Sequence, residues 1–301
     1  MSFINKALEK AKSLHHQKVK PTPSPSQEAP KAPLPDLDEI TGFAETLGEI
    51  HYTHTRKVAV DMESLRRNRL IVAGSDETLG GAYKLLRTHI LHGTKREGWN
   101  TLMVTGPLPN EGKTLTTINL AIAISQKVGQ TVLVVDADLR NPSIHRYLDL
   151  PSGPGLVDYL TSGYPIAESL VHPEGLANLV VLPAGQPTTQ SHELLSSPLM
   201  VDLVRELKHF YPDRYVLFDL PPLLNADALA FAPLVDGIIL VVEAGSTPRE
   251  EITRALAMLK GFPVLGCVLN KINPLELSYD NYYKYYPDQD SQKKFKLPWF
   301  N

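Results

Sequence analysis

Short apolar runs alternate with amphipathic stretches over most of this 301-residue chain, and this alternation limits the fold classes it can adopt. The runs that read as β-strands are residues 101–105, 131–135, 179–182, 215–218, 237–242 and 264–269. The stretches with helical periodicity are residues 113–127, 192–210 and 248–260. Buried strands that alternate with helices are typical of a parallel sheet covered on both faces. The sequence therefore predicts one doubly wound, mostly parallel α/β domain over about residues 70–273.

The segments outside this domain differ from it in composition. Residues 1–19 place apolar side chains at helical spacing among lysines, which predicts a basic amphipathic helix. Such a helix either docks on a membrane surface or a partner, or is frayed and solvated, because so short a helix is marginal alone. Residues 20–36 contain six prolines and predict an extended linker. We assign residues 37–69 to an adaptor segment and 274–301 to a flexible, tyrosine-rich tail.

Composition excludes several classes of protein. The formal net charge of −3 gives no overall attraction to nucleic acid, so no nucleic-acid partner is expected. The single cysteine, Cys267, rules out a disulfide framework and is expected to be a buried core residue. No apolar run approaches the roughly 18 residues that a membrane-spanning helix needs. The sequence therefore predicts a soluble, intracellular protein.

A phosphate-binding loop follows the first predicted strand. Residues 106–114 end in Gly112, Lys113 and Thr114 and open a helix. This pattern surrounds phosphate oxygens with backbone N–H groups and places a lysine on the outer phosphates. Pro107 stands where the pattern has glycine, and Gly106 is displaced by one position. Asn110 is able to take the left-handed conformation that glycine usually provides.

Three acidic residues follow two other predicted strands. Asp136 and Asp138 come after the strand at 131–135, and Asp219 comes after the strand at 215–218. Since ligands bind at the carboxyl ends of parallel strands, these acids are expected beside the phosphate loop. Carboxylates there hold Mg²⁺ directly or through water, and Thr114 offers a hydroxyl. A single acid at a strand end is often only a helix cap or turn residue, but three behind one phosphate loop favour a magnesium–nucleotide site.

The end of the chain supplies candidate acceptors for a phosphoryl group. Five of its twelve tyrosines fall within eight residues. They are Tyr279, Tyr282, Tyr283, Tyr285 and Tyr286. Asp280, Lys284 and Asp288 keep this segment polar, which predicts an accessible segment.

Taken together, these motifs resemble the bacterial tyrosine kinases of capsule and exopolysaccharide synthesis, in their cytoplasmic type. The family pattern joins a modified phosphate loop, Asp-x-Asp-x-Arg, Asp-x-Pro-Pro and a tyrosine-rich C-terminus. Here these are residues 109–114, 136–140, 219–222 and 279–286. The resemblance implies a P-loop NTPase fold of the MinD/ParA-like branch, with ATP and Mg²⁺. It also implies tyrosine autophosphorylation between subunits of a homo-oligomer.

The resemblance further implies partners and a location. The activator would be a transmembrane polysaccharide co-polymerase that regulates chain length, and a cognate tyrosine phosphatase would reverse the modification. The kinase would be cytoplasmic and recruited peripherally to the inner face of the membrane. One family motif, Glu-x-x-Arg-x-x-Arg, which serves ring assembly, is altered here to Gly81, Lys84 and Arg87. The size of the assembly is therefore left open.

Roles for the site residues follow from their chemistry and the resemblance. Lys113 is assigned to the β- and γ-phosphates, and Thr114, Asp136 and Asp219 to Mg²⁺. Asp138 is assigned to orient or deprotonate the acceptor hydroxyl, although Asp136 and Asp138 are interchangeable at this stage. The catalytic set is thus Lys113, Asp136, Asp138 and Asp219. The expected nucleotide contacts are Pro109, Asn110, Glu111, Gly112, Lys113, Thr114, Leu115, Arg140 and Asn270.

Several alternatives remain open from sequence. Arg140 supports phosphate charge or pairs with an acid, and Asn270 meets the adenine or ends a strand. A MinD/ParA-like ATPase switch is the main alternative function, but Leu108 occupies the position of its second lysine. A non-catalytic scaffold with an aromatic tail is the third. Because the last strand should end at the active-site edge and Pro274 stiffens the departing chain, transfer to a neighbouring subunit is favoured over transfer within one chain.

Overall fold

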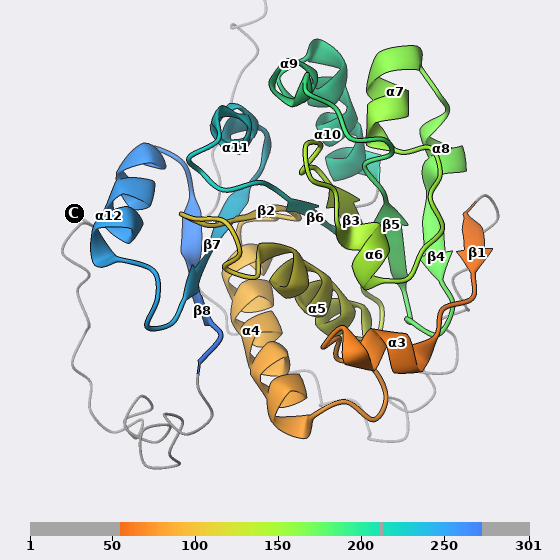
Figure 1. The fold of residues 1–301 in the computed structure, drawn as a ribbon, viewed down its shortest axis with the longest axis horizontal. Helices are drawn as coiled ribbons and strands as arrows, with labels where there is room; N and C mark the ends of the chain where they lie inside the picture. The colour runs from red at the N-terminus through yellow and green to blue at the C-terminus, as the bar shows by residue number, and fades with distance from the viewer. Residues whose placement is uncertain (1–54, 211–212, 273–301) are drawn as a thin grey trace, which may run out of the picture. The chain divides into compact units, whose positions relative to one another are not determined.

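One eight-stranded sheet organises the part of the chain that the computed structural model describes, residues 55–210 and 213–272. The strand order is β1-β4-β5-β3-β6-β2-β7-β8 (Figure 1). All neighbouring strands are parallel except β4 and β5, which are antiparallel. The expected doubly wound, mostly parallel α/β sheet is confirmed. The predicted N-terminal helix, proline linker and tyrosine tail lie outside the described residues.

All six predicted strands are present. They are β2 (Thr101–Thr105), β3 (Thr131–Asp136), β5 (Leu179–Leu182), β6 (Arg214–Asp219), β7 (Gly237–Glu243) and β8 (Val264–Asn270). Two more strands, β1 (Arg56–Val58) and β4 (Val171–Pro173), have three residues each and were not predicted. So short a segment contains too few residues to show an alternating pattern.

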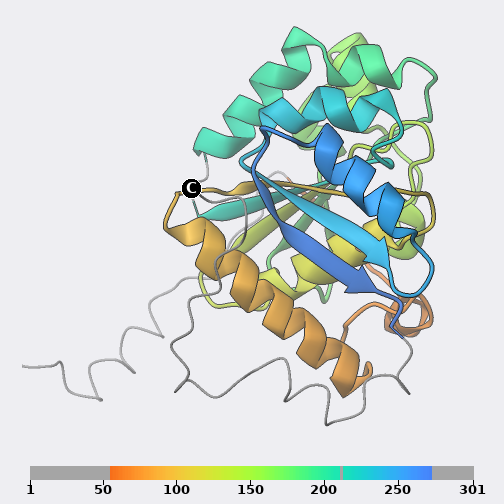
Figure 2. The same ribbon diagram turned by 90° about the vertical axis from the view of Figure 1, so that its left-hand side faces the viewer.

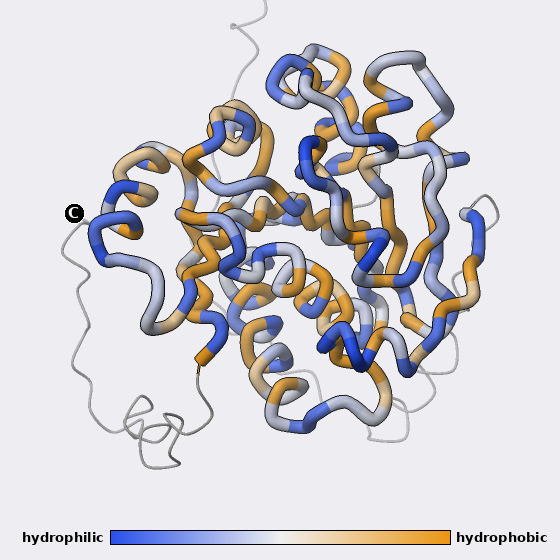
Figure 3. The backbone as a smooth tube through the Cα atoms, viewed as in Figure 1, coloured by the Kyte–Doolittle hydropathy of each residue, from blue (hydrophilic) through white to orange (hydrophobic). Residues whose placement is uncertain are grey.

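Side chains from alternate strand positions enter two separate hydrophobic clusters. On β2, Leu102 and Val104 join one cluster and Met103 joins the other. The first cluster is covered by α4 (Glu77–Lys95) and α5 (Lys113–Ser125), and the second by α10 (Pro198–Phe210), α11 (Ala226–Phe231) and α12 (Arg249–Met258), as Figures 1 and 2 show. Figure 3 shows the resulting pattern, with apolar residues concentrated along the central strands. Alternation on the strands therefore explains the two-sided covering.

Residues 55–69, the described part of the expected adaptor segment, join the same sheet and core. β1 pairs with β4, and α3 (Met62–Arg67) buries Leu65 completely. Asp61 caps the start of α3 by accepting the N–H groups of Glu63 and Ser64.

Two expectations differ from the structure. The predicted helix at 192–210 is two helices, α9 (Ser191–Leu195) and α10, because Pro198 lacks an N–H and suits only a first helical turn. The expectation that Cys267 is buried is wrong, since its side chain is exposed. It lies on β8, which pairs only with β7 and so forms an edge of the sheet. The remaining helices, α6 (Ile144–Tyr147), α7 (Leu156–Ser162) and α8 (Ile166–Ser169), are short and were not predicted.

Candidate active site

Three adjacent parallel strands bring the predicted site residues to one edge of the sheet. β2 leads into the phosphate loop, β6 lies beside it, and β3 lies beside β6. Asp136 at the end of β3 is the register partner of Asp219 at the end of β6. Two buried carboxylates therefore lie side by side at the sheet edge to which the loop belongs.

The phosphate loop is held in its shape by residues with left-handed backbone. Asn110 has φ +63°, and Gly112 has φ +87°. A side chain at Gly112 would also collide with the amide of Asn270, which donates a hydrogen bond to the Glu111 carbonyl oxygen at 2.9 Å. The end of β8 is thus fastened to the loop. Glycine at 112 is required by both its φ value and the contact with Asn270.

The Glu111 carboxylate forms an internal brace of the loop. It is almost fully buried and accepts hydrogen bonds from the Leu108 N–H at 2.8 Å and the Thr247 hydroxyl at 2.7 Å. Its side chain ties the loop to the segment after β7, so only its backbone is left for the predicted contact with a nucleotide. Sequence reasoning missed Thr247 because it is distant in the chain.

Lys113 begins α5 and turns back over the loop. Its ammonium donates to the Leu108 carbonyl oxygen at 2.7 Å. Burial lowers the pKa of Lys113, while the carboxylates of Glu111, Asp219 and Asp138 oppose that shift. A lysine held this way is placed to exchange one backbone oxygen for phosphate oxygens.

Asp219 is tied to the start of α5. It accepts hydrogen bonds from the Thr114 hydroxyl at 2.6 Å and the Thr117 hydroxyl at 3.2 Å. Burial raises the pKa of Asp219 to about 7, against the lowering effect of these hydroxyls. The carboxyl group is therefore poised between its two protonation states near neutral pH.

Asp136 keeps one carboxylate oxygen without a partner. Its Oδ2 accepts the N–H groups of Ser143 and Ile144 at 2.9 and 3.0 Å. Its Oδ1 is buried and makes no hydrogen bond within the described part of the chain. Burial raises the pKa of Asp136 well above its ordinary value, and the neighbouring Asp219 adds to the shift. Buried polar atoms normally have partners, so this oxygen suits a water or a cation.

The residues present fit Mg²⁺ that arrives with a nucleotide. Asp136 Oδ1, the Asp219 carboxylate and the Thr114 hydroxyl are hard oxygen donors of the kind that Mg²⁺ takes. Among residues 55–210 and 213–272, no group of three or more His, Cys, Asp or Glu side chains is arranged to hold a metal ion. Magnesium commonly uses one or two carboxylates together with waters and phosphate oxygens. This donor set is therefore suited to a metal that shares its coordination with phosphate.

Asp138 differs from the other two acids in its exposure. It lines the cavity over the loop, whereas Asp136 and Asp219 are buried below it. Its carboxylate accepts the Asn141 N–H at 3.1 Å, and burial raises its pKa. Of the two assignments left open, this geometry favours Asp136 as the metal ligand and Asp138 as the residue facing an acceptor.

Arg140 lies away from the cavity. Its guanidinium donates to Asp227 at 3.0 Å and to the Ser191 hydroxyl at 2.7 Å, and Asp227 is almost fully buried. Of its two open roles, the structure shows the ion pair with an acid. Asn270 and Leu115 both line the cavity, as do Pro109 and Asn110.

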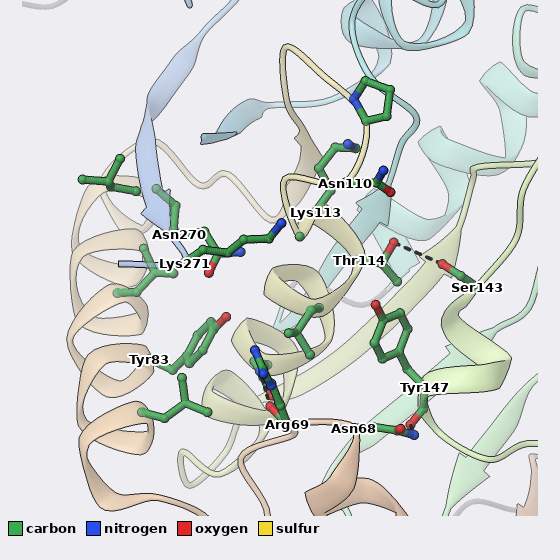
Figure 4. A pocket seen from close by; sticks show the side chains of 18 of the residues that line it. Asn68, Arg69, Tyr83, Asn110, Lys113, Thr114, Ser143, Tyr147, Asn270 and Lys271 are labelled. Carbon is green, nitrogen blue, oxygen red and sulfur yellow. Dashed lines mark hydrogen bonds between the residues drawn. The ribbon is translucent and has the colours of Figure 1, made fainter. Parts of the chain in front are cut away.

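A cavity of about 1420 Å³ extends from the loop along both sides of α5 (Figure 4). It brings in residues that sequence reasoning did not select, among them Arg69, Tyr83, Ser143, Tyr147 and Lys271. The Ser143 hydroxyl lies 3.2 Å from the Thr114 hydroxyl (Figure 4). Ser143 follows closely on the Asp-x-Asp-x-Arg motif, and that closeness was the available signal for it.

Comparisons with known proteins identify the family. No protein-family model matches the chain. The tyrosine-protein kinase YwqD of Bacillus subtilis is 32% identical over 231 residues, which cover 75% of this chain and 94% of that protein. The chain belongs to the bacterial tyrosine kinases.

Other members agree with this assignment. The kinase domain of the Escherichia coli tyrosine kinase ETK shares 30% identity with a TM-score of 0.60, covering 64% of this chain and 75% of that one. The succinoglycan biosynthesis transport protein ExoP of Rhizobium meliloti is 31% identical over 254 residues, which cover 81% of this chain and 30% of that protein. The tyrosine kinase reading is therefore favoured over the ATPase switch.

Two further features of this bacterial tyrosine kinase concern assembly and membranes. Gly81, Lys84 and Arg87 lie on α4, where Arg87 donates to the Ala123 carbonyl oxygen at 3.0 Å. Arg87 thus helps to fasten α4 to α5.

In the described part of the chain, no helix has the length and apolar character needed to cross a membrane.

Proposed function

We propose that this chain is an ATP- and Mg²⁺-dependent tyrosine autokinase of capsule or exopolysaccharide synthesis and export, which phosphorylates the tail of a neighbouring copy. One observation carries the proposal. The cavity that holds Lys113, Thr114 and Asp138 is also lined by Asn270, the last residue of β8. β8 therefore ends beside the phosphate loop, and the tyrosine cluster follows β8 in the sequence.

The residues divide the chemistry among them. Lys113 and the loop N–H groups would hold the β- and γ-phosphates, and Thr114, Asp136 and Asp219 would hold Mg²⁺. When bound, the metal neutralises phosphate charge. Asp138 would accept the proton of the tyrosine hydroxyl as its oxygen bonds to the γ-phosphorus, while the bond to the β–γ bridging oxygen breaks and ADP leaves.

Transfer between subunits is supported by where the tail begins. Eight residues separate Asn270 from the first tail tyrosine, Tyr279, and Pro274 stiffens this stretch. A return to the same active site would need an immediate reversal of the chain. An extended chain covers about 3.3 Å per residue, so the cluster reaches an adjoining subunit readily. A homo-oligomer follows from this proposal.

The wider setting is inferred from the family. ExoP is named as a biosynthesis transport protein of the polysaccharide succinoglycan, which supports a role in polysaccharide export and a membrane co-polymerase as activator. We assign membrane recruitment from the cytoplasm to residues 1–19, and dephosphorylation to a cognate tyrosine phosphatase. Deleting residues 1–20 is expected to abolish recruitment to the membrane, as measured by fractionation of cells. Unchanged recruitment would contradict this docking role.

Incubation with γ-labelled ATP and Mg²⁺ separates the candidate functions. Labelled phosphotyrosine on the chain supports the kinase, and its loss in Lys113→Met ties the label to this site. Release of phosphate without phosphotyrosine would instead support the ATPase switch. If neither phosphotyrosine nor free phosphate is formed in the presence of the membrane activator, the result would favour the scaffold.

A further inference from the structure

Three arginines from segments outside the phosphate loop line the same cavity. Arg67 and Arg69 come from the end of α3 and the turn after it, and Arg146 comes from α6. The side-chain amide of Asn68 donates to the Tyr147 carbonyl oxygen at 2.9 Å and so fastens the α3 turn to α6. Figure 4 shows Arg69 directed into the cavity between Tyr83 and Tyr147. We call Arg67, Arg69 and Arg146 the arginine rim.

The backbone of Arg69 is fixed in an unusual conformation. Its φ is +61°, a left-handed value that residues other than glycine rarely adopt. The buried Asn119 of α5 clamps this turn, since its amide donates to the Arg69 carbonyl oxygen at 3.1 Å and its oxygen accepts the Ile71 N–H at 2.9 Å. The clamp fixes the backbone from which the Arg69 side chain enters the cavity.

The rim has unused capacity for binding carboxylates. Within the described residues, Arg69 and Arg146 make no ion pair, and Arg67 has only a 3.5 Å contact with Asp61. The Arg146 guanidinium donates one hydrogen bond, to the Pro142 carbonyl oxygen at 3.2 Å. The other cavity cations are engaged nearer the loop, where Lys113 bonds to the Leu108 carbonyl oxygen and Lys271 pairs with Glu243 at 2.8 Å. A guanidinium presents a planar fork that matches a carboxylate. The rim is therefore available to an acidic ligand.

The tail carries acids at a regular distance from its tyrosines. Glu276 lies three positions before Tyr279, and Asp280 lies two and three positions before Tyr282 and Tyr283. Asp288 lies three and two positions after Tyr285 and Tyr286. Every tail tyrosine thus has an acid two or three positions away, which is about 7–10 Å along an extended chain.

That spacing is comparable with the length of α5 between Thr114 and the residue that clamps Arg69. Asn119, which clamps Arg69, follows Thr114 by five residues on α5, or about 8 Å along the helix axis at 1.5 Å per residue. We propose that the arginine rim is an acceptor-selecting subsite that binds the acid two or three residues from the acceptor tyrosine of a second copy. The proposal rests on the proposed kinase function and names what makes a tyrosine a substrate.

A charge exchange between two full-length chains tests the subsite. The acceptor carries Lys113→Met, so that it cannot phosphorylate itself, and the donor carries Phe at all five tail tyrosines. In the donor, Arg69→Glu with Arg146→Glu is expected to slow phosphorylation of the acceptor tail about tenfold. Two exposed ion pairs between the rim and the tail are lost, and the new glutamates repel the acids of the tail. An acceptor with Glu276→Lys, Asp280→Lys and Asp288→Lys is expected to restore most of the rate. The readout is intact mass of the acceptor over time.

Matched controls keep the test specific. Arg205→Glu changes an exposed arginine on α10 whose one ion pair among residues 55–210 and 213–272 is with Asp202, and it is expected to leave the rate unchanged. Arg69→Asn removes the positive charge, and asparagine tolerates the left-handed backbone at this position. This variant is expected to slow transfer without lowering the melting temperature.

The possible results separate the subsite from the kinase function. The donor with Arg69→Glu and Arg146→Glu is expected to bind a fluorescent ADP analogue with the affinity of the parent chain. If its affinity for the analogue falls together with the transfer rate, the arginines act on the nucleotide and the subsite is overturned. The subsite would also be overturned if the acceptor with three lysines in its tail fails to restore the rate of the donor with Arg69→Glu and Arg146→Glu, while the parent pair is active. No transfer by the parent pair in the presence of the membrane activator would refute the proposed function itself, and the subsite with it.

Discussion

At the scale of residues, the site is dominated by two carboxyl groups that the sheet forces together. Asp136 and Asp219 are register partners on neighbouring strands, and both are buried. Burial raises both pKa values, that of Asp219 to about 7. Without a cation the pair therefore retains protons that it would release when a metal binds.

Magnesium–nucleotide binding is accordingly expected to depend on pH. Ionised Asp219 is the form that binds a cation, so affinity should rise by about tenfold between pH 6 and pH 8 for a pKa near 7. Asp219→Asn is expected to bind more weakly and to lose most of this dependence. Titration with a fluorescent nucleotide in buffered Mg²⁺ measures both. An unchanged pH profile in the variant would show that another group controls metal binding.

Stability of the nucleotide-free protein should follow the opposite trend. A carboxyl whose folded pKa is raised contributes stability that is fully present below its unfolded pKa of about 4 and is lost as pH rises through about 7. Asp219→Asn stays neutral, so at pH 8 it should be more stable than the parent by roughly 2–4 kcal/mol. At pH 4 the two should be similar. Urea unfolding at both pH values checks this; a variant that is less stable at pH 8 would contradict it.

The displaced glycine of the phosphate loop has a steric reason. A methyl group at Gly106 would collide with the Val241 carbonyl oxygen on β7 and with the Glu111 carboxylate. Gly106→Ala is expected to shift the loop and weaken ATP binding at least tenfold, or by about 1.4 kcal/mol. The control is Gly93→Ala on α4, where an added methyl meets no atom within 4 Å and helix propensity should rise. Equal ATP affinity for the two variants would refute the steric explanation.

At the scale of elements, the sequence predicted the long central strands because their apolar runs are unambiguous. It missed β1 and β4, which are short, and it joined α9 to α10 across Pro198. Cys267 was wrongly predicted to be buried because an edge strand and a central strand have the same apolar sequence pattern. The misplacement of Cys267 is thus a case in which tertiary position outweighs local pattern, whereas the other errors have local causes, short strands and the proline at 198.

The same distinction applies to the site. Lys113, Thr114 and the acids after β3 and β6 were predictable, since parallel strands end at a common edge. The partners of Arg140, namely Asp227 and Ser191, were not, because they come from α11 and the start of α9. The arginine rim was not predicted for a similar reason, since Arg146 lies far along the chain from Arg67 and Arg69, and the turn after α3 is fastened to α6 only in the folded protein.

The Asn119 clamp is the interaction that fixes the turn after α3. Asn119→Ala removes both hydrogen bonds and leaves two backbone groups at residues 69 and 71 without partners. The free energy of unfolding is expected to fall by about 1–3 kcal/mol per buried unsatisfied group. Thr88→Ala, at an exposed hydroxyl on α4, serves as a control and should change stability little. Equal stability of the two variants in urea unfolding would show that the turn is held by other contacts.

At the scale of the whole molecule, charge on the tail is expected to control assembly. Each phosphate adds about −1.5 to −2 charges, and a heavily modified tail would be repelled from the acid-rich, nucleotide-loaded site of a neighbour. We expect ATP and Mg²⁺ to dissociate an oligomer of the parent chain, as measured by light scattering. A variant with Phe at the five tail tyrosines should remain assembled. Dissociation of both would show that nucleotide binding alone separates the subunits.

The central claim is that one copy transfers phosphate to the tail of another. The most direct measurement is intact mass after ATP and Mg²⁺ treatment of a mixture containing the Lys113→Met chain and the chain with Phe at all five tail tyrosines. Neither chain alone should gain mass through its tail. In the mixture, the Lys113→Met chain should gain up to five phosphates. If that chain stays unmodified while the parent chain phosphorylates itself, transfer occurs within a single chain and the account is contradicted.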